Sequence, residues 1–397
     1  MKLLLLSDSV MNVNRGGLSQ TLYNLFCFLP AENILCITSI KAYKISPASE
    51  PYRSRYITYY YDVIPVPNNR LANWLAPVIT KINYFFNKYF RRFRKVHSAI
   101  HSFNPDVIVS CPNGSEGVFM HAKLSKSFKG TVFPYFMDDW LYQLDAGNTI
   151  HLLTKKILKE NPNWLMISKN LSDILSQRYN IYPRHLLEVH NPVDLTNIPG
   201  HLPIEKKDKY TIAYAGALWP MHFDALVTMA KAVQALGEKR NIQLKIYTAQ
   251  ANWDWRKKEL RELGVVYGGH VPYQQIHQKL AEADCLLVTA SFLPEWETHS
   301  RASVQTKLTD YLKAGRLVIS CGPGYAANHE FLKKYDCGIC IETNNAPVVA
   351  EKLDAVLSAI ELNEHYIENG FNTLRSEFSF EAVHKELKEF LTADYCQ

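Results

Sequence analysis

The chain has 397 residues, of which 47% are hydrophobic and 21% are charged, and its formal net charge is +6 at pH 7. This composition excludes a disordered or fibrous protein, and the length exceeds that of one ordinary hydrophobic core, so two domains are expected. The mild positive charge favours anionic partners such as phosphates, acidic lipids or nucleic acid, without choosing among them.

The apolar segments are too short for membrane spans or a secretion signal. No apolar run approaches the roughly 18 residues that cross a bilayer, and the run Leu3–Leu6 is closed by Asp8, which predicts a buried strand. The eight cysteines have no disulfide framework spacing, and the single Cys337-Gly338-Ile339-Cys340 has no second pair or nearby histidine. The sequence therefore predicts a cytoplasmic protein, soluble or peripheral on the inner face of the membrane.

Short apolar runs alternate with amphipathic stretches in both halves of the chain, which predicts βαβ units and parallel sheets. The pattern restarts near residue 210, so the expected α/β fold has two Rossmann-like domains facing each other across a cleft. Buried strands are predicted at 3–6, 34–38, 107–110, 131–136 and 165–167, and then at 211–214, 243–247, 265–267, 285–289 and 317–321.

The domain boundaries follow from proline, glycine and charge between the two series of strands. We expect an N-terminal domain at 1–195, a linker at 196–209 and a second domain at 210–375. In the remainder, 376–397, Ser379 can cap a helix whose apolar residues form one stripe. Such a terminal helix docks on a domain that is already formed, and the N-terminal domain is one of the two surfaces available.

Two glycines, Gly16 and Gly17, follow the first predicted strand and precede a helix. Paired glycines let a backbone approach a ligand closely, and a helix N-terminus offers unpaired N–H groups, so a phosphate or a sugar hydroxyl suits this place. A tight turn without a ligand explains the pair equally well.

Two acids and an indole, Asp138-Asp139-Trp140, follow the strand predicted at 131–136. Ligands of parallel α/β sheets lie beyond the carboxyl ends of strands, and a carboxylate there can act as general base toward an acceptor hydroxyl. The alternative is that one of the acids caps the following turn. An isolated pair of acids is not a convincing metal site.

The segment 291–324 is the richest in candidate functional residues. Thr306 and Lys307 open a predicted helix, and together they supply a hydroxyl, N–H groups and an ammonium, which suit a diphosphate. Asp310 lies on the same helix face three residues later, where it can hold ribose hydroxyls. The alternative is that Lys307 and Asp310 form an exposed ion pair that contributes little.

The sequence Gln305-Thr306-Lys307-Leu308 and the stretch 311–319 resemble the donor-binding helix of GT-B-fold glycosyltransferases. These include the family-4-like group and bacterial surface-polysaccharide enzymes. Further motifs follow in the order of that family and cover nearly the whole chain: Gly16-Gly17, Asp138-Asp139-Trp140, the segments 167–171 and 190–194, Tyr214-Ala215-Gly216-Ala217-Leu218 and Tyr267-Gly268-Gly269-His270-Val271-Pro272.

The resemblance implies a hexosyltransferase-like enzyme that moves a sugar from a nucleotide-diphosphate sugar to a saccharide or lipid-linked saccharide. It implies no further cofactor and no metal, because Lys307 and helix N-termini offset the charge of the departing diphosphate. Asp138 or Asp139 would lie near the acceptor. Donor contacts are implied for Gly16, Gly17, Gly216, Gly269, His270, Val271, Thr306, Lys307 and Asp310.

The sequence departs from the family pattern at three positions. Relatives carry Arg and Lys shortly after the glycine that opens the second domain, where this chain has Ala217 and His222. The Glu that often precedes the ribose-binding acid by eight residues is replaced by Ala302. Arg301 or Arg15 is expected to supply further positive charge, and Glu295 or Glu297 to contact the sugar.

Residues 81–97 combine an aromatic stripe with a cationic face and predict an amphipathic helix. An interfacial membrane helix has this pattern, and its expected membrane contacts are Phe86, Phe90, Arg91, Arg92, Phe93 and Arg94. A core-facing helix with a basic outer surface is the main alternative, and a nucleic-acid-binding face is less favoured. Two functions other than transfer stay open: a nucleotide-sugar epimerase of the same fold, and a non-catalytic protein that binds nucleotide sugars or nucleic acid.

Overall fold

The structure is a computed structural model that describes residues 1–15, 17–64, 75–143, 147–196 and 207–395. Gly16 and most of the predicted linker 196–209 lie outside these residues. The chain divides into two compact units. Unit 1 comprises Met1–Met166, Leu175–Glu188 and Leu387–Gln397, and unit 2 comprises Ile167–Ile174 and Val189–Glu386. Each unit is described by itself below.

Unit 1 contains a seven-stranded sheet whose order is β3-β2-β1-β4-β5-β6-β7. All neighbouring strands pair in parallel. The two central strands, β1 and β4, are buried at every residue, as expected for a sheet covered on both faces. The strands are β1 (Leu3–Ser7), β2 (Ile34–Ser39), β3 (Tyr56–Tyr59), β4 (Val107–Cys111), β5 (Thr131–Phe136), β6 (Asn163–Met166) and β7 (His185–Glu188).

Unit 2 contains a six-stranded parallel sheet of the corresponding order, β10-β9-β8-β11-β12-β13. Its strands are β8 (Tyr210–Ala215), β9 (Ile242–Tyr247), β10 (Val266–Gly269), β11 (Cys285–Thr289), β12 (Leu317–Cys321) and β13 (Ile339–Ile341). In both sheets the chain first adds strands on one side of the first strand and then on the other side. The switch point lies between β1 and β4 in unit 1 and between β8 and β11 in unit 2. The crevice at such a switch point is where open α/β sheets bind ligands.

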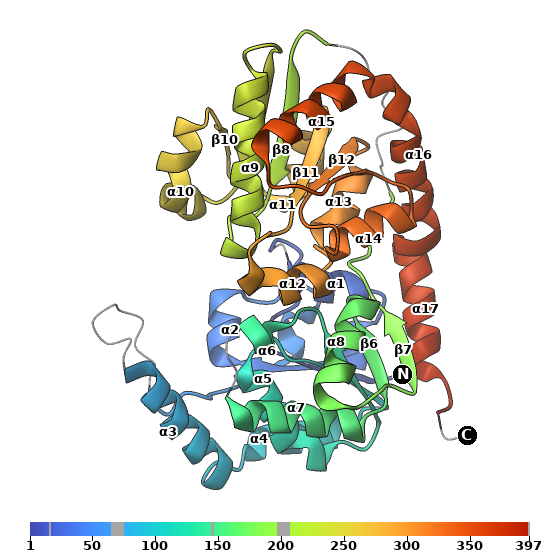
Figure 1. Ribbon diagram of the computed structural model, residues 1–397. Helices are drawn as coiled ribbons and strands as arrows, with labels where there is room; N and C mark the ends of the chain where they lie inside the picture. The colour runs from blue at the N-terminus through green and yellow to red at the C-terminus, as the bar shows by residue number, and fades with distance from the viewer. Residues whose placement is uncertain (16, 65–74, 144–146, 197–206, 396–397) are drawn as a thin grey trace. The chain divides into compact units, whose positions relative to one another are not determined.

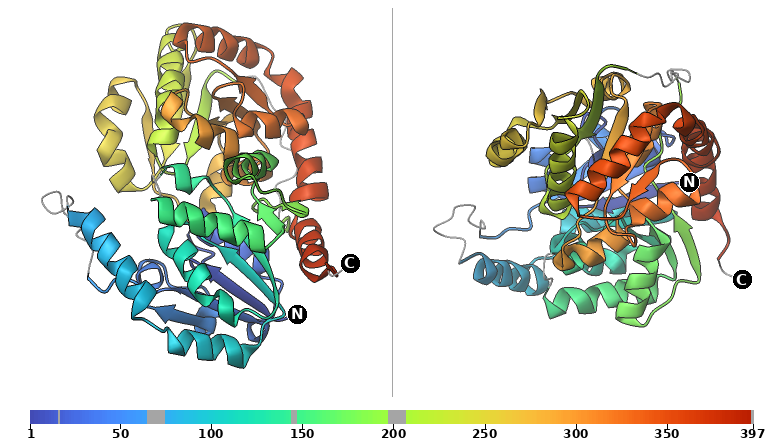
Figure 2. Two further views of the ribbon diagram at one scale, coloured as in Figure 1. Left: turned by 60° about the horizontal axis from the view of Figure 1, so that its bottom comes forward. Right: turned by 45° about the horizontal axis from the view of Figure 1, so that its top comes forward.

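Helices cover the sheets of both units (Figures 1 and 2). In unit 1 they are α1 (Leu18–Phe26), α2 (Ile40–Ile45), α3 (Ala76–Tyr89), α4 (Arg94–Phe103), α5 (Ser115–Leu124), α6 (Trp140–Gln143) and α7 (Asn148–Glu160), and α8 (Lys169–Tyr179) begins in unit 2. In unit 2 they are α9 (Pro220–Leu236), α10 (Gln250–Glu262), α11 (Tyr273–Ala281), α12 (Glu297–Ala302), α13 (Lys307–Lys313), α14 (Ala327–Lys334), α15 (Ala346–Ser358) and α16 (Glu364–Thr373), followed by α17 (Phe380–Thr392). Among the described residues, no helix is long and apolar enough to cross a membrane.

The predicted α/β fold with two parallel sheets is confirmed, and each predicted strand has a counterpart. The predicted terminal helix is also present: Ser379 caps α17 by accepting a hydrogen bond from the Ala382 N–H at 3.1 Å. Its last residues belong to unit 1, where the rings of Phe390 and Tyr395 lie 5.7 and 5.8 Å from the ring of Phe133. The described cysteines are all free.

Candidate active site

Gly216 and Lys307 meet at the switch point of unit 2, where β8 ends. Gly216 follows β8 directly and has a φ of 136°, a conformation that residues other than glycine rarely adopt. A Cβ at this position would lie 3.0 Å from Nζ of Lys307. The absence of a side chain therefore leaves room for the Lys307 ammonium beside an exposed stretch of backbone.

Lys307 begins α13 and points back toward β8. Its Nζ lies 3.9 Å from the centroid of the Tyr214 ring, a distance at which the ring face attracts a cation. Burial lowers the pKa of Lys307 to about 7. A buried ammonium with so little hydration gains more from an anionic ligand than an exposed lysine does.

Histidine and glutamine side chains surround the same place. The side-chain amide of Gln305 donates to the carbonyl of Thr289, at the end of β11, at 2.6 Å, and it lies 3.5 Å from Nδ1 of His222. The rings of His222 and His299 are 5.8 Å apart. Burial lowers the pKa of His222 well below 6.5, and the neighbouring Lys307 and His299 lower it further. His222 is therefore neutral near pH 7 in the free protein, where its ring can form hydrogen bonds.

Asp310 is on the same short helix but is held by α11. The Tyr273 hydroxyl donates to its Oδ1 at 2.7 Å, and Nε2 of His277 lies 3.7 Å from that oxygen. Burial raises the pKa of Asp310 to about 6, although the Tyr273 hydrogen bond and Lys313 oppose this. The alternative of an exposed Lys307–Asp310 ion pair does not occur, since the two side chains have different partners.

The loop Gly269–Val271 follows the end of β10. Gly269 has a φ of 85°, and its carbonyl accepts a hydrogen bond from the Thr248 N–H at 3.1 Å. His270 is exposed, whereas Val271 is partly buried against the core of unit 2. The glycine thus turns the chain so that this loop and the end of β9 lie together at one edge of the sheet.

The remaining predicted residues of unit 2 lie around α12. Arg301 and Glu297 form an ion pair on the helix surface at 2.8 Å, and the Arg301 guanidinium lies 4.0 Å from the Tyr325 ring centroid. Glu295 is exposed in the turn before this helix. Thr306 is partly buried and precedes α13 without capping it through its side chain. Arg301 therefore has a carboxylate partner, unlike Lys307.

The two acids predicted to lie near the acceptor have structural partners in unit 1. Asp139 is 1% exposed, and both its oxygens accept hydrogen bonds from the Arg178 guanidinium at 2.7 and 2.5 Å. Asp138 accepts a hydrogen bond from the Asp139 N–H at 3.0 Å, as a residue that caps a turn does. Trp140 donates its indole N–H to the Pro112 carbonyl at 3.0 Å. The structure thus gives the buried Asp139 a cationic partner and places Asp138 shortly before α6.

We expect Arg178→Met to destabilise the protein by roughly 2–4 kcal/mol, because it leaves the Asp139 carboxylate buried without its cation. Asp139→Asn is expected to cost less, since the neutral amide is less costly to bury. The melting temperature of each variant measures the effect. Normal stability of Asp139→Asn combined with complete loss of sugar transfer would instead assign Asp139 a catalytic role.

The glycine pair after β1 is only half described, because Gly16 lies outside the described residues. Gly17 precedes α1 with a φ of 72°, and open space surrounds the position of a Cβ there. The conformation requires glycine, and the space would admit a ligand.

The helix predicted at 81–97 is two helices. α3 ends at Tyr89, and Phe93 has a φ of 45° immediately before α4. The inward face of α3 is polar: Asn83 and Asn87 are fully buried, and their amides bind the backbone of residues 61–64. Phe93 and Val96 belong to the core side instead, Phe93 with its ring 6.0 Å from that of Tyr59. Phe93, one of the expected membrane contacts, is thus partly buried against this core.

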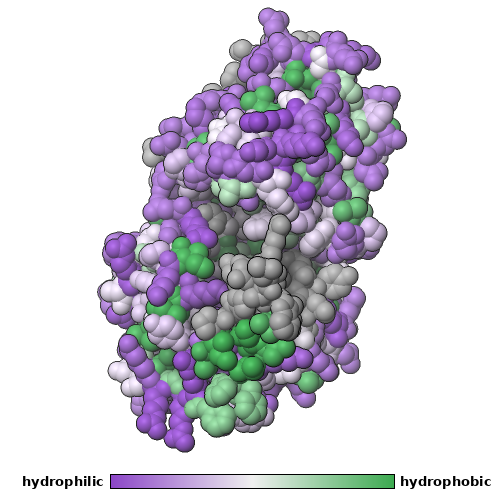
Figure 3. All heavy atoms as spheres, turned by 90° about the vertical axis from the view of Figure 1, so that its left-hand side faces the viewer, coloured by the Kyte–Doolittle hydropathy of each residue, from purple (hydrophilic) through white to green (hydrophobic). Residues whose placement is uncertain are grey.

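The outward face of α3 carries aromatic rings. Phe85, Phe86, Tyr89 and Phe90 are 41–66% exposed, and their rings lie 4.9–6.3 Å apart. We call these four residues the aromatic patch. Figure 3 shows green side chains gathered on the face of the molecule that carries α3. Among the described residues, the aromatic patch is therefore exposed and does not pack against the core.

Comparisons with known proteins agree with the order and direction of the strands. Residues 209–359 match the family described as Glycosyl transferases group 1. No curated protein matches the sequence. Three similar solved structures are HepE of Anabaena in complex with UDP-glucose (13% identity, 99% of each chain covered, TM-score 0.68), sucrose-phosphate synthase of Thermosynechococcus elongatus (13%, 98% of each chain, 0.70) and the lipopolysaccharide outer core galactosyltransferase WaaB in apo form (15%, 98% of this chain and 99% of that chain, 0.61).

Two parallel sheets of this kind in one chain, similar over their whole length to these structures, define the GT-B fold. The segment that matches the Glycosyl transferases group 1 model contains Gly216, Lys307 and Asp310. The protein is accordingly a glycosyltransferase.

His222, Gln305 and Tyr214 are the parts of this site that sequence reasoning did not assign. His222 was visible only as the place where relatives carry lysine. Tyr214 and Gln305 lie inside the motifs that carry the resemblance, but nothing in the sequence indicates that their side chains meet Lys307 and His222.

Proposed function

We propose that the protein transfers a sugar from a nucleotide-diphosphate sugar to a hydroxyl of a saccharide or lipid-linked saccharide in surface-polysaccharide synthesis. Unit 2 binds the donor and unit 1 binds the acceptor. The observation that carries this proposal is the weakly hydrated Lys307 ammonium beside Gly216, at the switch point of a parallel sheet. Support also comes from HepE, whose structure contains UDP-glucose.

In this proposal Lys307 binds the diphosphate, and the exposed backbone at Gly216 approaches it. Asp310 accepts hydrogen bonds from the ribose, and the loop Gly269–Val271 contacts the base. Thr306 and Arg301 add donors near the phosphates, and Glu295 or Glu297 contacts the sugar. His222, which is neutral in the free protein, donates a hydrogen bond to the diphosphate.

The chemical work is to place an acceptor hydroxyl near the anomeric carbon and to stabilise the departing nucleotide diphosphate. The Lys307 ammonium supplies positive charge where that negative charge develops. We propose that transfer requires no metal, since this cation occupies the role that a metal ion has in other transferases. Among the described residues, no group of three or more His, Cys, Asp or Glu side chains is placed to hold a metal.

A thermal-shift panel of uridine, guanosine, adenosine and cytidine nucleotide sugars tests the donor proposal, because a ligand that binds the native state raises its melting temperature. We expect one nucleotide class to raise it and its sugar to be transferred or slowly hydrolysed. If no nucleotide sugar changes the melting temperature, the donor proposal fails.

Donor affinity is expected to fall as the pH is raised above about 7, the pKa of Lys307 in the free protein. The nucleotide sugar carries the same diphosphate charge from about pH 6 to pH 8.5, whereas binding requires the protonated ammonium. The bound diphosphate raises the pKa of Lys307, so the dissociation constant increases by about tenfold per pH unit between the free and bound pKa values. Calorimetric titration at constant ionic strength measures this. In Lys307→Arg the guanidinium stays charged, and the pH dependence is expected to disappear; an unchanged slope would assign it to another group.

We propose further that the aromatic patch holds the protein on the inner face of the membrane, where a lipid-linked acceptor resides. Exposed rings beside cationic side chains are the pattern of an interfacial helix. Lys81, Lys88, Arg92, Arg94 and Lys95 are exposed on α3, α4 and their junction. In the part of the chain that the structure describes, α3 turns its hydrogen-bonded asparagines and Tyr84 inward, so the four rings of the aromatic patch face outward.

A further inference from the structure

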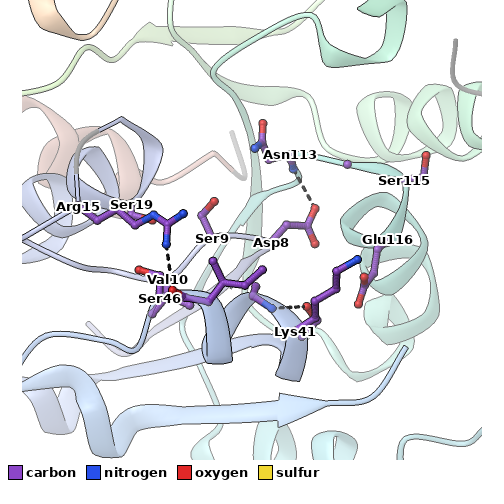
Figure 4. Close-up of a pocket in the computed structure, with 14 residues that line it drawn as sticks. Asp8, Ser9, Val10, Arg15, Ser19, Lys41, Ser46, Asn113, Ser115 and Glu116 are labelled. Atoms are coloured by element: carbon purple, nitrogen blue, oxygen red, sulfur yellow. Dashed lines mark hydrogen bonds between the residues drawn. The ribbon is translucent and has the colours of Figure 1, made fainter. Parts of the chain in front are cut away.

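A cavity of about 360 Å³ lies at the switch point of unit 1, where β1 and β4 end. Asp8 and Ser9 follow β1, and Asn113 and Glu116 follow β4, so the cavity occupies the place that corresponds to the Lys307 site in unit 2. Five serines line it as well, together with Arg15 and Lys41 (Figure 4). None of the residues discussed for the acceptor above, Asp138 and Asp139, lines it.

Asp8 is held over the start of α5. Its Oδ2 accepts a hydrogen bond from the Asn113 N–H at 3.0 Å, and a Cβ at Gly117 would lie 2.2 Å from the same oxygen. Only glycine at position 117 therefore lets the carboxyl group reach this place. The other oxygen, Oδ1, is buried and has no hydrogen-bond partner in the protein.

Glu116, in the first turn of α5, also has a buried carboxyl oxygen. Its Oε1 is buried and has no hydrogen-bond partner. Figure 4 shows the Lys41 side chain extending from α2 toward the Glu116 carboxyl group. Burial, with smaller contributions from Asp8 and Asp62, raises the pKa of Glu116 to about 8, although Lys41 and the Tyr59 hydroxyl oppose this. Burial likewise raises the pKa of Asp8 to about 7.

Two buried carboxyl oxygens without donors are costly to the protein alone, at about 1–3 kcal/mol each. Hydroxyl groups of a ligand would supply the missing donors, and the serines, Asn113, Lys41 and Arg15 would pair with its oxygens. With these raised pKa values the two acids are partly or largely uncharged near pH 7, and the two cations, Arg15 and Lys41, are exposed to solvent. The buried part of the lining therefore favours a ligand without net charge. The volume is sufficient for one or two sugar rings.

We infer that this cavity binds the acceptor as an uncharged saccharide, with Asp8 and Glu116 accepting hydrogen bonds from its hydroxyl groups. This inference rests on the proposed function, since only a transferase that uses a saccharide acceptor needs such a cavity. In this inference Asp8 and Glu116 bind the acceptor, in place of Asp138 and Asp139. Asp8 and Glu116 each have a buried oxygen without a hydrogen-bond partner.

Saturation-transfer NMR on the full chain tests the inference with named probes: the methyl glycosides of glucose, galactose, mannose and N-acetylglucosamine, and for comparison the charged methyl glucuronide and glucosaminide. We expect at least one uncharged glycoside to bind, and to bind better than both charged ones. Glu116→Gln and Asp8→Asn each are expected to weaken that binding by tenfold or more. Glu32→Gln, an exposed acid in unit 1, is the matched control and is expected to have no effect.

Nucleotide-sugar binding by the same variants separates this inference from the donor proposal. It is expected to be unchanged, because both acids are in unit 1. If Asp8→Asn does not fold, Glu116→Gln carries the test, since an amide of the same shape replaces a largely neutral acid. Failure of every uncharged glycoside to bind the wild type, or equal binding by Glu116→Gln, overturns the inference. If the wild type binds no nucleotide sugar, the donor proposal is overturned instead.

Discussion

Lys307→Ala is expected to weaken nucleotide-sugar binding by more than tenfold while the protein stays folded. A hydrogen bond to a charged group contributes about 1.5–3 kcal/mol, and each 1.4 kcal/mol is a factor of ten in affinity. Lys307 lies at the end of β8 with its charge poorly hydrated, so little of its interaction with a diphosphate is lost to competing water. Calorimetric titration of the best nucleotide sugar from the thermal-shift panel measures the change.

Stability distinguishes loss of a binding group from loss of the fold. The pKa of Lys307 falls from its ordinary 10.5 to about 7 on folding. Between these values the unfolded chain binds more protons than the native one, so this residue makes stability rise with pH over that range and lowers it at neutral pH. Lys307→Met is therefore expected to melt at a higher temperature than the wild type near pH 7, while it binds the donor poorly.

Lys279→Ala is the matched control, because Lys279 is an exposed lysine of unit 2 that pairs with Glu282 on the surface of α11. It is expected to change neither donor affinity nor melting temperature by a measurable amount. Unchanged affinity of Lys307→Ala for every nucleotide sugar tried would remove Lys307 from the donor site and with it the main support for the proposed function.

The sequence predicts the two sheets well because their central strands are buried on both faces. Such strands are continuous apolar runs, as at Leu3–Leu6 and in the strand Cys285–Thr289, where no polar residue interrupts the pattern before its last residue. The strands β3 and β7, which the apolar runs do not predict, lie at the two edges of their sheet. Edge strands are short and partly exposed, so their residues alternate weakly and resemble loops.

A residue of the candidate site is predictable from the sequence when its type and local position indicate a single role. A lysine at the start of a helix in the second domain suggests a phosphate contact, and the structure places Lys307 beside Gly216 at the switch point. The role of Asp138 and Asp139 is harder to predict, because a carboxylate after a strand has the same sequence pattern whether it caps a turn, pairs with a distant arginine or contacts a ligand. The partner of Asp139, Arg178, is 39 residues away in sequence, and no local pattern connects them.

Asp8 shows the opposite error. In the sequence, Asp8 stands out only as the residue that ends an apolar run. In the structure, it borders the cavity of unit 1. Its environment depends on Gly117 and Glu116, more than a hundred residues later, which only the pairing of β1 with β4 brings beside it. Helix α3 is a third case: its aromatic stripe is evident in the sequence, but the buried asparagines that decide which face turns outward are not.

The double variant Phe86→Ser, Phe90→Ser is expected to weaken binding to anionic vesicles by about 100-fold or more. Insertion of one phenylalanine ring into an apolar phase contributes about 1.5–3 kcal/mol, so two rings contribute about 3–6 kcal/mol, and 1.4 kcal/mol is a factor of ten. The rings of Phe86 and Phe90 are exposed and lie 5.5 Å apart, so their removal opens no cavity in the core. Co-sedimentation with vesicles of phosphatidylglycerol and phosphatidylcholine measures the loss.

Charge and apolar contact can be separated on the same helix pair. Arg92→Gln, Arg94→Gln is expected to weaken binding by about 10- to 30-fold, since each cation near an anionic surface contributes about 1 kcal/mol, and this loss is expected to vanish on neutral vesicles or in high salt. Arg91 is left in place because its guanidinium donates to the Tyr60 carbonyl and so supports the fold. Leu152→Ser, at an exposed apolar residue of α7, is the control, and it is expected to bind as the wild type does. A wild-type protein that stays in the supernatant with anionic vesicles, or a Phe86→Ser, Phe90→Ser variant that sediments with them as fully as the wild type, would show that the aromatic patch serves another partner.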